Sequence, residues 1–366
     1  MTSKKTLMLF ALVGVVIAAI VYLNAQKPPR AIIGGTVEVK TAVHKEDLSA
    51  GRQEKQNRYP VAKEITTPDG FINTDGKPIT IGEFIGKKVV LVDFWTYSCI
   101  NCQRTTPYLN AWYEKYKDKG FVIIGMHTPE FEFEKNYQNV LDATKRLGIK
   151  YPVVLDNDFS TWNAYQNRFW PRKYLIDIDG YIVYDHAGEG AYEETEQKIQ
   201  KLLEERMTVL GVEGEIAKDV SKPTGVADVD FSLERSPEIY FGAARNTYLG
   251  NGDSGTQGVQ TLEQPQRVKT NTLYLTGEWE FLDEFAKNRS AGAKIIFRYQ
   301  AKNVYFVANA KGGVTVEIFK DGTSQGTKFV QGEELYQLVA DMEYGEHTLE
   351  MIVESPGLEA FTFTFG

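Results

Sequence analysis

The chain has 366 residues, of which 42% are hydrophobic and 25% are charged, and its net charge is −8. This composition excludes a disordered polymer, a collagen and a multispanning membrane protein, and the length suggests two globular domains of roughly 100–200 residues each. Only two cysteines are present, so the fold cannot depend on a network of disulfides, and both thiols are available for chemistry.

The acidic excess lies in the C-terminal part of the chain. Residues 226–366 contain 20 acidic and 12 basic residues, and no basic residue follows Lys328. Binding to nucleic acid needs a basic surface. We therefore expect no nucleic-acid partner.

The N-terminal segment has the pattern of a membrane anchor. Lys4 and Lys5 precede an uncharged apolar run from Leu7 to Leu23. As a helix this run would be roughly 25 Å long, at the short end of what crosses a bilayer. Signal-peptide cleavage after Ala25 would need a small residue where Leu23 stands. An uncleaved anchor is therefore favoured over a removed signal peptide, and both place the rest of the chain outside the cytoplasmic membrane.

These patterns divide the chain into five parts. Residues 1–25 form the anchor, and residues 26–58 form a flexible tether, because they are largely polar and residues 24–58 contain no aromatic side chain. An α/β domain is predicted at 59–206, a linker at 207–230 and an all-β domain at 231–366.

Residues 59–206 alternate short apolar runs with helical stretches, which is typical of an α/β fold. Two runs, 89–95 (VVLVDFW) and 121–126 (FVIIGM), are almost continuously apolar and are predicted to be central strands covered on both faces. The other predicted elements are helices at 105–119, 140–147 and 195–205, and a hairpin of strands 174–178 and 181–184 joined by Asp179-Gly180.

In the C-terminal domain the pattern changes to alternation of apolar and polar residues. The alternation is clear in residues 295–299, 314–318, 349–353 and 361–365, and glycine-containing turns punctuate these runs. The sequence shows no long helical pattern here. This part is therefore predicted to fold as an all-β sandwich or jelly roll.

Cys99 and Cys102 follow strand 89–95 and open the next helix. The free N–H groups at a helix N-terminus stabilise the thiolate that attacks a disulfide, and a second thiol one turn later can resolve the mixed disulfide. Half of a zinc site, a structural disulfide and a pair of inert buried thiols are the alternatives. A zinc site would need further ligands, but the chain has no other cysteine and its histidines are scattered. A disulfide across so short a loop would stabilise little.

The sequence around these cysteines resembles a known family. LVDFWTYSCINC followed by Pro107 resembles the active-site strand, turn and helix of thioredoxins, and a helix and strand at about 136–155 resemble the insertion of the TlpA and ResA branch. FINTDGK, DFWTYSCINCQRTTPYL, GMHTPEFEFEK and SPEIYFGAARN are similar to the extracytoplasmic part of DipZ proteins, over roughly residues 71–366. This resemblance implies a thioredoxin-like redox domain followed by a β-sandwich similar to a carbohydrate-binding module.

The front of the chain departs from the DipZ pattern. DipZ proteins carry an electron-conducting polytopic domain there, whereas this chain has one apolar run. The resemblance therefore implies a separate membrane electron donor of CcdA or DsbD type, with oxidised extracytoplasmic proteins as substrates. Because the chain has no third cysteine, each electron that the pair gains or loses crosses to another molecule. No cofactor or metal is expected.

The resemblance also assigns catalytic roles. Cys99 is the attacking thiol and Cys102 the resolving one. Asp93 matches the buried acid of thioredoxin, which can accept the proton of Cys102 because burial raises the pKa of its carboxyl group. The alternative is a carboxylate at a strand edge facing water. Glu130, in HTPEF, matches an active-site glutamate of ResA-like proteins; the alternative is an acid at the N-terminus of a helix after Pro129.

Three aromatic residues and one proline are predicted to contact the substrate. Trp170-Pro171 resembles the loop whose cis-proline faces the dithiol and whose backbone pairs with an extended substrate segment; the alternative is an ordinary trans proline at a strand start. Trp95 and Tyr97 are expected to pack beside the dithiol and to form an apolar lip where the substrate docks.

Four aromatic residues of the all-β domain are candidates for a glycan-binding platform, although aromatic residues on strands more often pack in a core. They are Trp279, Tyr248, Tyr274 and Tyr299. A glycan therefore remains a candidate partner of this domain.

Three functions are compatible with the sequence. The first is a membrane-anchored thiol–disulfide oxidoreductase that reduces exported proteins. The second is a thiol peroxidase, for which Thr96 has the right spacing to Cys99 but Val92 stands where a proline is expected. The third is a cell-wall glycan-binding protein in which the redox domain is secondary.

Overall fold

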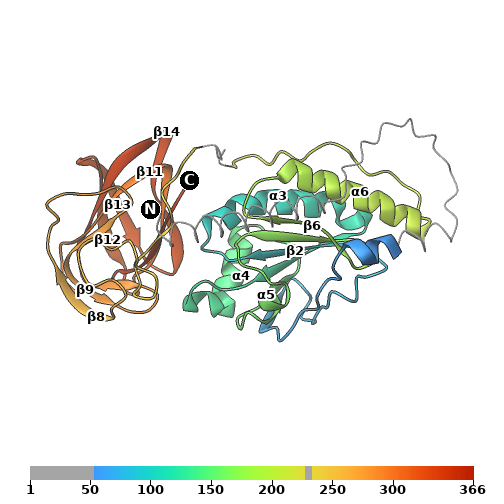
Figure 1. Cartoon of the computed structure of the whole chain (residues 1–366), viewed down its shortest axis with the longest axis horizontal. Helices are drawn as coiled ribbons and strands as arrows, with labels where there is room; N and C mark the ends of the chain where they lie inside the picture. The colour runs from blue at the N-terminus through green and yellow to red at the C-terminus, as the bar shows by residue number, and fades with distance from the viewer. Residues whose placement is uncertain (1–52, 227–232) are drawn as a thin grey trace, which may run out of the picture. The chain divides into compact units, whose positions relative to one another are not determined.

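The computed structural model describes residues 53–226 and 233–366 (Figure 1), which belong to one compact unit covering 46–366. The expected membrane anchor and nearly all of the tether lie outside the described residues, as does part of the expected linker. Among the helices that the structure describes, none is both long and apolar enough to cross a bilayer.

The first part of the described chain is built on a six-stranded sheet with the strand order β1-β4-β3-β2-β5-β6. Strands β2, β3 and β4 are parallel, and β1, β5 and β6 pair antiparallel with their neighbours. The strands are β1 (Gly70–Ile72), β2 (Val89–Trp95), β3 (Phe121–His127), β4 (Val153–Leu155), β5 (Arg172–Ile176) and β6 (Ile182–Ala187). The predicted central strands and the predicted hairpin are confirmed.

The helices of this part are α3 (Ile100–Tyr116), α4 (Tyr137–Arg146), α5 (Ser160–Ala164) and α6 (Tyr192–Leu210). Two short 3₁₀ helices, η1 (Lys117–Lys119) and η2 (Glu132–Lys135), flank β3. Helix α3 begins five residues earlier than predicted, directly after Cys99, and it includes Pro107. Pro107 lies past the first turn, so the helix lacks the hydrogen bond that a residue at this position would donate to the Gln103 carbonyl oxygen.

Strand β2 is buried on both faces, which explains its almost continuous apolar sequence. Val89 and Leu91 pack in one core with α3 and α6, and Val90 and Val92 pack in a second core with Trp162 of α5. Alternate side chains of a strand point to opposite faces, so each face of the sheet is covered. This burial fixes the end of β2, from which the active-site turn continues.

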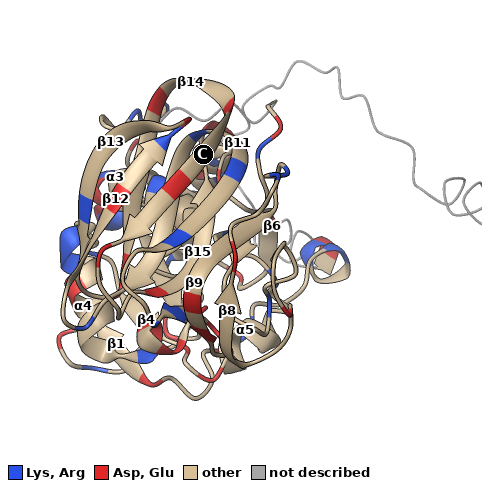
Figure 2. Ribbon diagram, turned by 90° about the vertical axis from the view of Figure 1, so that its left-hand side faces the viewer, with Lys and Arg blue, Asp and Glu red and all other residues tan. Residues whose placement is uncertain are grey.

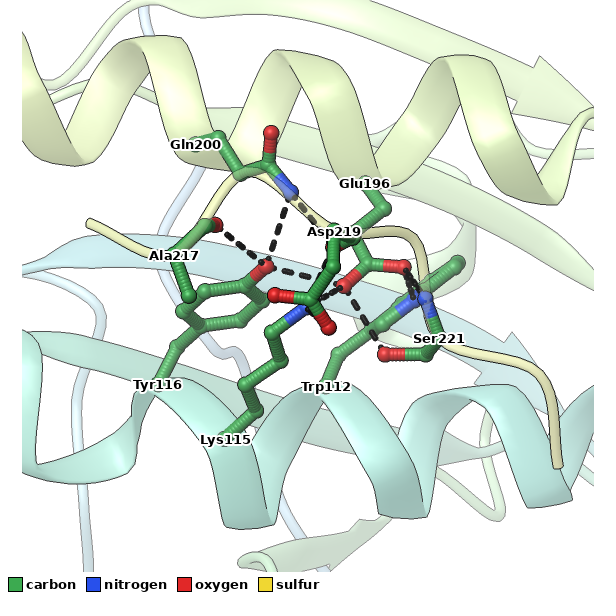
Figure 3. Close-up of polar contacts among 8 residues, drawn as sticks. All are labelled: Trp112, Lys115, Tyr116, Glu196, Gln200, Ala217, Asp219 and Ser221. Carbon is green, nitrogen blue, oxygen red and sulfur yellow. Dashed lines mark hydrogen bonds and ion pairs between the residues drawn. The ribbon is translucent and has the colours of Figure 1, made fainter.

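A buried carboxylate joins the C-terminal half of α3 to α6 (Figure 3). Glu196 of α6 is fully buried and accepts five hydrogen bonds. The donors are Trp112 Nε1, Lys115 Nζ and Tyr116 OH on α3, and the N–H and hydroxyl groups of Ser221. This network anchors α3 at the end away from the cysteines and also fastens the chain that leaves α6.

The second part of the described chain is all-β, as predicted. Its strands are β7 (Ile239–Tyr240), β8 (Gly258–Leu262), β9 (Leu273–Phe281), β10 (Ala286–Asn288), β11 (Ala293–Asn309), β12 (Val314–Lys320), β13 (Thr323–Val330), β14 (Glu334–Val353) and β15 (Glu359–Phe365). Outward-facing side chains of β11 and β14 form ion pairs across the strands, Lys294–Glu350 at 2.8 Å and Arg298–Glu346 at 3.0 Å. Figure 2 shows both signs of charge on these strands.

The described strands of this part do not form two separate facing sheets, so the sandwich prediction needs correction. They form one hydrogen-bonded network in which β9, β10, β15 and β11 close into a small barrel. The reason is the long strand β11, whose first half pairs with β9 and whose second half pairs with β15. Register shifts near Ala301 and Val304 separate the two halves, and such bulges bend a strand.

Most of the aromatic residues considered for a glycan platform belong to the core. Trp279 and Tyr299 are fully buried, and Tyr274 is nearly so. Of the four candidates only Tyr248 is exposed. The burial of Tyr274, Trp279 and Tyr299 on β9 and β11 therefore reflects packing in the core, in line with the alternative interpretation of these aromatic residues.

Candidate active site

The two cysteines lie at the N-terminus of α3, where β2 delivers the chain. Cys99 is the residue that precedes the first helical turn, and its N–H donates to the Thr96 carbonyl oxygen at 3.4 Å. Cys99 is partly exposed, whereas Cys102, one turn further on, is buried. A disulfide substrate can therefore reach Cys99 but not Cys102.

The surroundings of Cys102 disfavour its thiolate. Burial raises the pKa of the Cys102 thiol, and contact with Cys99 and the charge of Asp93 raise it further, against an opposing backbone hydrogen bond at Thr96. The net result is a pKa well above the ordinary value of a thiol. Cys102 is thus protonated while Cys99 reacts, and a base must remove its proton before it can attack.

Asp93 is buried in the middle of β2, as its place in an apolar strand predicts. Lys173 of β5 is its cross-strand partner and is also fully buried. Burial raises the pKa of Asp93 to about 7, while the charge of Lys173 acts in the opposite direction. Among the described residues, none makes a hydrogen bond to Asp93 Oδ1. An acid with this pKa can exchange a proton near neutral pH, but its role as acceptor for Cys102 stays a prediction.

The Trp170–Pro171 peptide bond is cis, and it lies beside the nucleophile. The Cys99 sulfur is 3.9 Å from the Trp170 carbonyl oxygen. The Trp170 indole donates to the Thr128 carbonyl oxygen at 3.0 Å and packs on Trp162. These contacts fix the loop next to Cys99, where the resemblance places it; the role of Trp170 and Pro171 toward a substrate is still a prediction.

Glu130 lies in the loop after β3 and does not begin a helix, since η2 starts two residues later. Its carboxylate forms an ion pair with Arg245 at 2.8 Å and accepts a hydrogen bond from the Tyr240 hydroxyl at 2.8 Å. Arg245 also stacks on the Tyr240 ring, 3.8 Å from its centroid. The structure therefore places Glu130 among side chains of the all-β part, and it lines the same cavity as Cys99.

Sequence reasoning missed Glu134, which is the buried glutamate of η2. Its carboxylate accepts hydrogen bonds from the Ser98 hydroxyl at 2.6 Å and the Ser98 N–H at 3.3 Å. Burial raises the pKa of Glu134 to about 7, against the hydrogen bond from Ser98. The only signal in the sequence was the alternation of acidic and aromatic residues in EFEFE, which resembles a solvated acidic segment as much as a structured one.

Trp95 and Tyr97 do not form the expected apolar lip, because both are buried with only 2% of their surface exposed. Tyr97 stacks on the His127 ring, and Trp95 meets the same ring edge-on. Burial lowers the pKa of His127 to about 3, so this imidazole is neutral. The three rings form an apolar layer under the active-site turn.

A cavity of about 620 Å³ opens over Cys99. Residues from both parts of the described chain line it. They are Cys99, Ile100, Asn101, Glu130, Arg168, Phe169, Trp170, Leu233, Arg235, Ser236, Glu238, Tyr240, Arg245, Thr364 and Phe365. Its volume is that of a typical ligand site and suits a segment of a few residues that carries a disulfide.

One cluster of acidic side chains in the described residues has the spacing of a metal site. It consists of Asp177, Asp179 and Glu205. The Lys55 ammonium group lies among these carboxylates and forms ion pairs with all three. The cluster is therefore satisfied by a lysine and gives no reason to invoke a metal.

The fold and the dithiol define a thioredoxin-like thiol–disulfide oxidoreductase. Residues 57–203 match the model of the Redoxin family, and residues 236–366 match that of the Thioredoxin like C-terminal domain. The thiol–disulfide oxidoreductase ResA of Bacillus cereus is 32% identical over 157 residues, which are 42% of this chain and 86% of ResA. The chain therefore belongs to the family of thioredoxin-like thiol–disulfide oxidoreductases of the ResA and DipZ type.

The similarity to DipZ extends through both parts of the chain. Protein DipZ of Mycobacterium tuberculosis is 37% identical over 338 residues, which are 91% of this chain and 46% of DipZ. Protein DipZ of Mycobacterium bovis matches to the same extent. The chain thus spans about half the length of these relatives.

Proposed function

We propose that this chain is a membrane-anchored reductant that works outside the cytoplasmic membrane. It takes electrons from a separate membrane donor of CcdA or DsbD type and passes them to disulfides of exported proteins. The apolar run 7–23 supports the anchor and the location. The observation that carries the direction of electron flow is the burial of Cys102, which raises the pKa of its thiol.

The proposed reaction uses three side chains, those of Cys99, Cys102 and Asp93. The Cys99 thiolate attacks one sulfur of the substrate disulfide, and the other substrate sulfur leaves as a thiolate. Asp93, as a carboxylate, accepts the proton of Cys102. The Cys102 thiolate then attacks the Cys99 sulfur, and the second substrate thiolate leaves. The substrate gains two electrons, and the enzyme is left with a Cys99–Cys102 disulfide, which the donor reduces.

The direction depends on how strongly the protein stabilises the reduced form. A dithiol whose thiolates are stabilised is a strong oxidant, because reduction is then favourable. Here burial and the charge of Asp93 destabilise the Cys102 thiolate. The dithiol form gains little stability from it, so the pair is expected to be a reductant.

The other two functions have less support. The Thr96 side chain is buried and lies 3.5 Å from His127 Nε2, so it does not line the cavity over Cys99. The aromatic residues considered for a glycan platform are mostly core residues. No specific contact of the described residues favours peroxide or glycan chemistry.

Trapping tests the proposed function. Cys102→Ser removes the resolving thiol, so mixed disulfides with Cys99 should accumulate in membranes of a cell that makes the full chain. We expect exported proteins and a membrane donor among the adducts, identified by mass spectrometry after release with a reductant. The double variant Cys99→Ser/Cys102→Ser is the control and should trap nothing.

Adducts made up only of cytoplasmic proteins would exclude the proposed location. The direction is tested separately by equilibrating the wild-type chain with glutathione. A pair that stays oxidised at a glutathione poise of about −200 mV would agree with a reductant. A pair that is fully reduced by this poise would contradict the proposed direction.

A further inference from the structure

The segment Glu130–Glu134, which runs from the loop after β3 into η2, alternates side chains that face opposite ways. The acidic Glu130 and Glu134 bind polar groups around the active site, whereas the intervening Phe131 and Phe133 pack on the all-β part. The ring centroids of Phe131 and Phe133 lie 5.1 and 4.9 Å from that of Phe361 on β15. The segment Glu130–Glu134 therefore touches both the active-site turn and the second part of the molecule.

Both oxygens of the Glu134 carboxylate are fully used. One oxygen accepts from the N–H and hydroxyl groups of Ser98, at 3.3 and 2.6 Å. The other accepts from the backbone N–H groups of Glu130 and Phe131, at 2.5 and 3.1 Å. The ionised carboxylate offers acceptor sites for all four donors, whereas the protonated form, which is also populated at neutral pH because burial raises the pKa of Glu134 to about 7, offers fewer. The side chain thus ties the residue before the nucleophile to the loop after β3.

The position of Ser98 matters because Cys99 follows it directly. The Glu134 carboxylate holds the Ser98 backbone from one side, and Tyr97, before Ser98, is held by the Gln103 side chain, which donates to its carbonyl oxygen at 2.8 Å. Small displacements of a reacting group reduce rates strongly, because attack on a disulfide needs an aligned approach. A loose Ser98 would let the Cys99 sulfur move relative to the Trp170 carbonyl, which is now 3.9 Å away.

We propose that Glu134 is a positioning residue for the nucleophile Cys99, and that the all-β part holds Glu134 in place through Phe131 and Phe133. The second part of the chain then has a role in catalysis without supplying a reacting group. The proposal rests on the thiol–disulfide exchange of the family, and not on the location or direction proposed above.

The contact that carries this coupling is apolar and local. Phe131, Val307 and Phe361 form a small buried cluster of their own, separate from the cores of the two parts. Partly buried side chains of both parts surround it, namely Phe133, Tyr240, Phe285 and Leu335. Truncating Phe361 should therefore loosen the loop while leaving both larger cores intact.

Each variant has a matched control in the same part of the chain. Glu134→Gln replaces one carboxylate oxygen by an NH₂ group, which cannot accept hydrogen bonds from the facing donors. Glu132→Gln is its control, since the Glu132 side chain is exposed and forms an ion pair with Lys135 at the surface. Phe361→Ala removes the contact with the loop, and Phe329→Ala is its control, since Phe329 is exposed on β13. All variants are made in the full chain.

The measurement is the first step of thiol exchange. The reduced protein is mixed with excess dithiodipyridine, a small uncharged disulfide that needs no docking surface, and the first release of thiopyridone reports the attack by Cys99. We expect Glu134→Gln and Phe361→Ala to slow this step about 10-fold or more. With insulin as substrate, kcat should fall while KM is unchanged, because positioning acts on the chemical step. Both controls should stay within about twofold of the wild type.

Wild-type kinetics in Glu134→Gln would overturn the proposal, and so would a loss confined to KM, which would indicate substrate docking. Wild-type kinetics in Phe361→Ala would overturn the part assigned to the all-β region. If Glu134→Gln does not fold, Ser98→Ala replaces it. This variant removes the hydroxyl donor to Glu134 and should slow the same step to a smaller extent, and an unchanged rate would contradict the proposal.

Discussion

A buried carboxyl group lies near each end of helix α3, and the surroundings shift the pKa values of the two groups in opposite directions. At the C-terminal end, Glu196 accepts five hydrogen bonds, which outweigh the effect of burial and lower its pKa (Figure 3). At the N-terminal end, only the charge of Lys173 opposes the burial of Asp93, and the pKa of Asp93 is raised to about 7. Hydrogen bonds to a carboxylate stabilise its charged form, and burial without them favours the neutral form.

This difference in pKa separates an acid with a structural role from an acid that can transfer a proton. Glu196 stays ionised and holds two helices and a chain segment together. Asp93 is balanced between its two protonation states near neutral pH, as proton transfer to or from a neighbouring thiol requires. The same helix is therefore anchored at one end and left chemically responsive at the other.

The largest effect is expected from removing the anchor. Glu196→Ala should lower the free energy of unfolding by about 3 kcal/mol, because it leaves Lys115 without its buried partner and leaves the donor Trp112 Nε1 unsatisfied. Urea unfolding measures the loss, and Glu194→Ala, at an exposed position of the same helix, is the control. Equal stability of the two variants would show that the network does not anchor α3.

A substitution of Asp93, near the N-terminal end of α3, should change the rate of thiol exchange more than it changes the free energy of unfolding. Asp93→Asn keeps the shape of the side chain but cannot accept a proton, so the resolving step should slow about 100-fold at neutral pH. The second release of thiopyridone in the dithiodipyridine reaction measures this step, and the first release, which depends on Cys99, is the internal control. An unchanged second phase would mean that another group accepts the proton of Cys102.

The sequence was sufficient to predict the dithiol end of this comparison. The strand VVLVDFW and the spacing of Cys99 and Cys102 are local patterns, and the family resemblance added Pro171 before β5; the structure places them together. A charged residue within an apolar run also indicated that Asp93 is buried. The inferences on the strand, the dithiol and Asp93 depend on residues close together in the sequence, whereas Pro171, about 70 residues further on, needed the resemblance.

Features that depend on tertiary contacts were missed. The donors to Glu196 come from residues 25 to 84 positions away, and the partner of Asp93 lies on another strand, so neither pattern is visible locally. Trp95 and Tyr97 were expected at the rim but lie under the turn, because both pack around His127. The closure of the all-β part depends on which halves of β11 pair with which strands, and alternation alone does not specify pairing.

The smallest expected effect is a shift in pH dependence at the catalytic end. Because only the carboxylate form of Asp93 accepts a proton, the rate of the resolving step should rise with pH through a midpoint near the Asp93 pKa of about 7. The charge of Lys173 lowers that pKa, so Lys173→Met should raise it and move the midpoint upward by about one pH unit.

The midpoint is read from the second release of thiopyridone as a function of pH. Lys198→Met is the control, since it removes a lysine from an exposed position on α6 and should leave the midpoint unchanged. A midpoint that does not move in Lys173→Met, or that moves equally in both variants, would show that Lys173 does not set the pKa of Asp93. Removal of the nearby positive charge of Lys173 raises the pKa of Asp93. A midpoint that moves downward would therefore show that the base that titrates in this step is not Asp93.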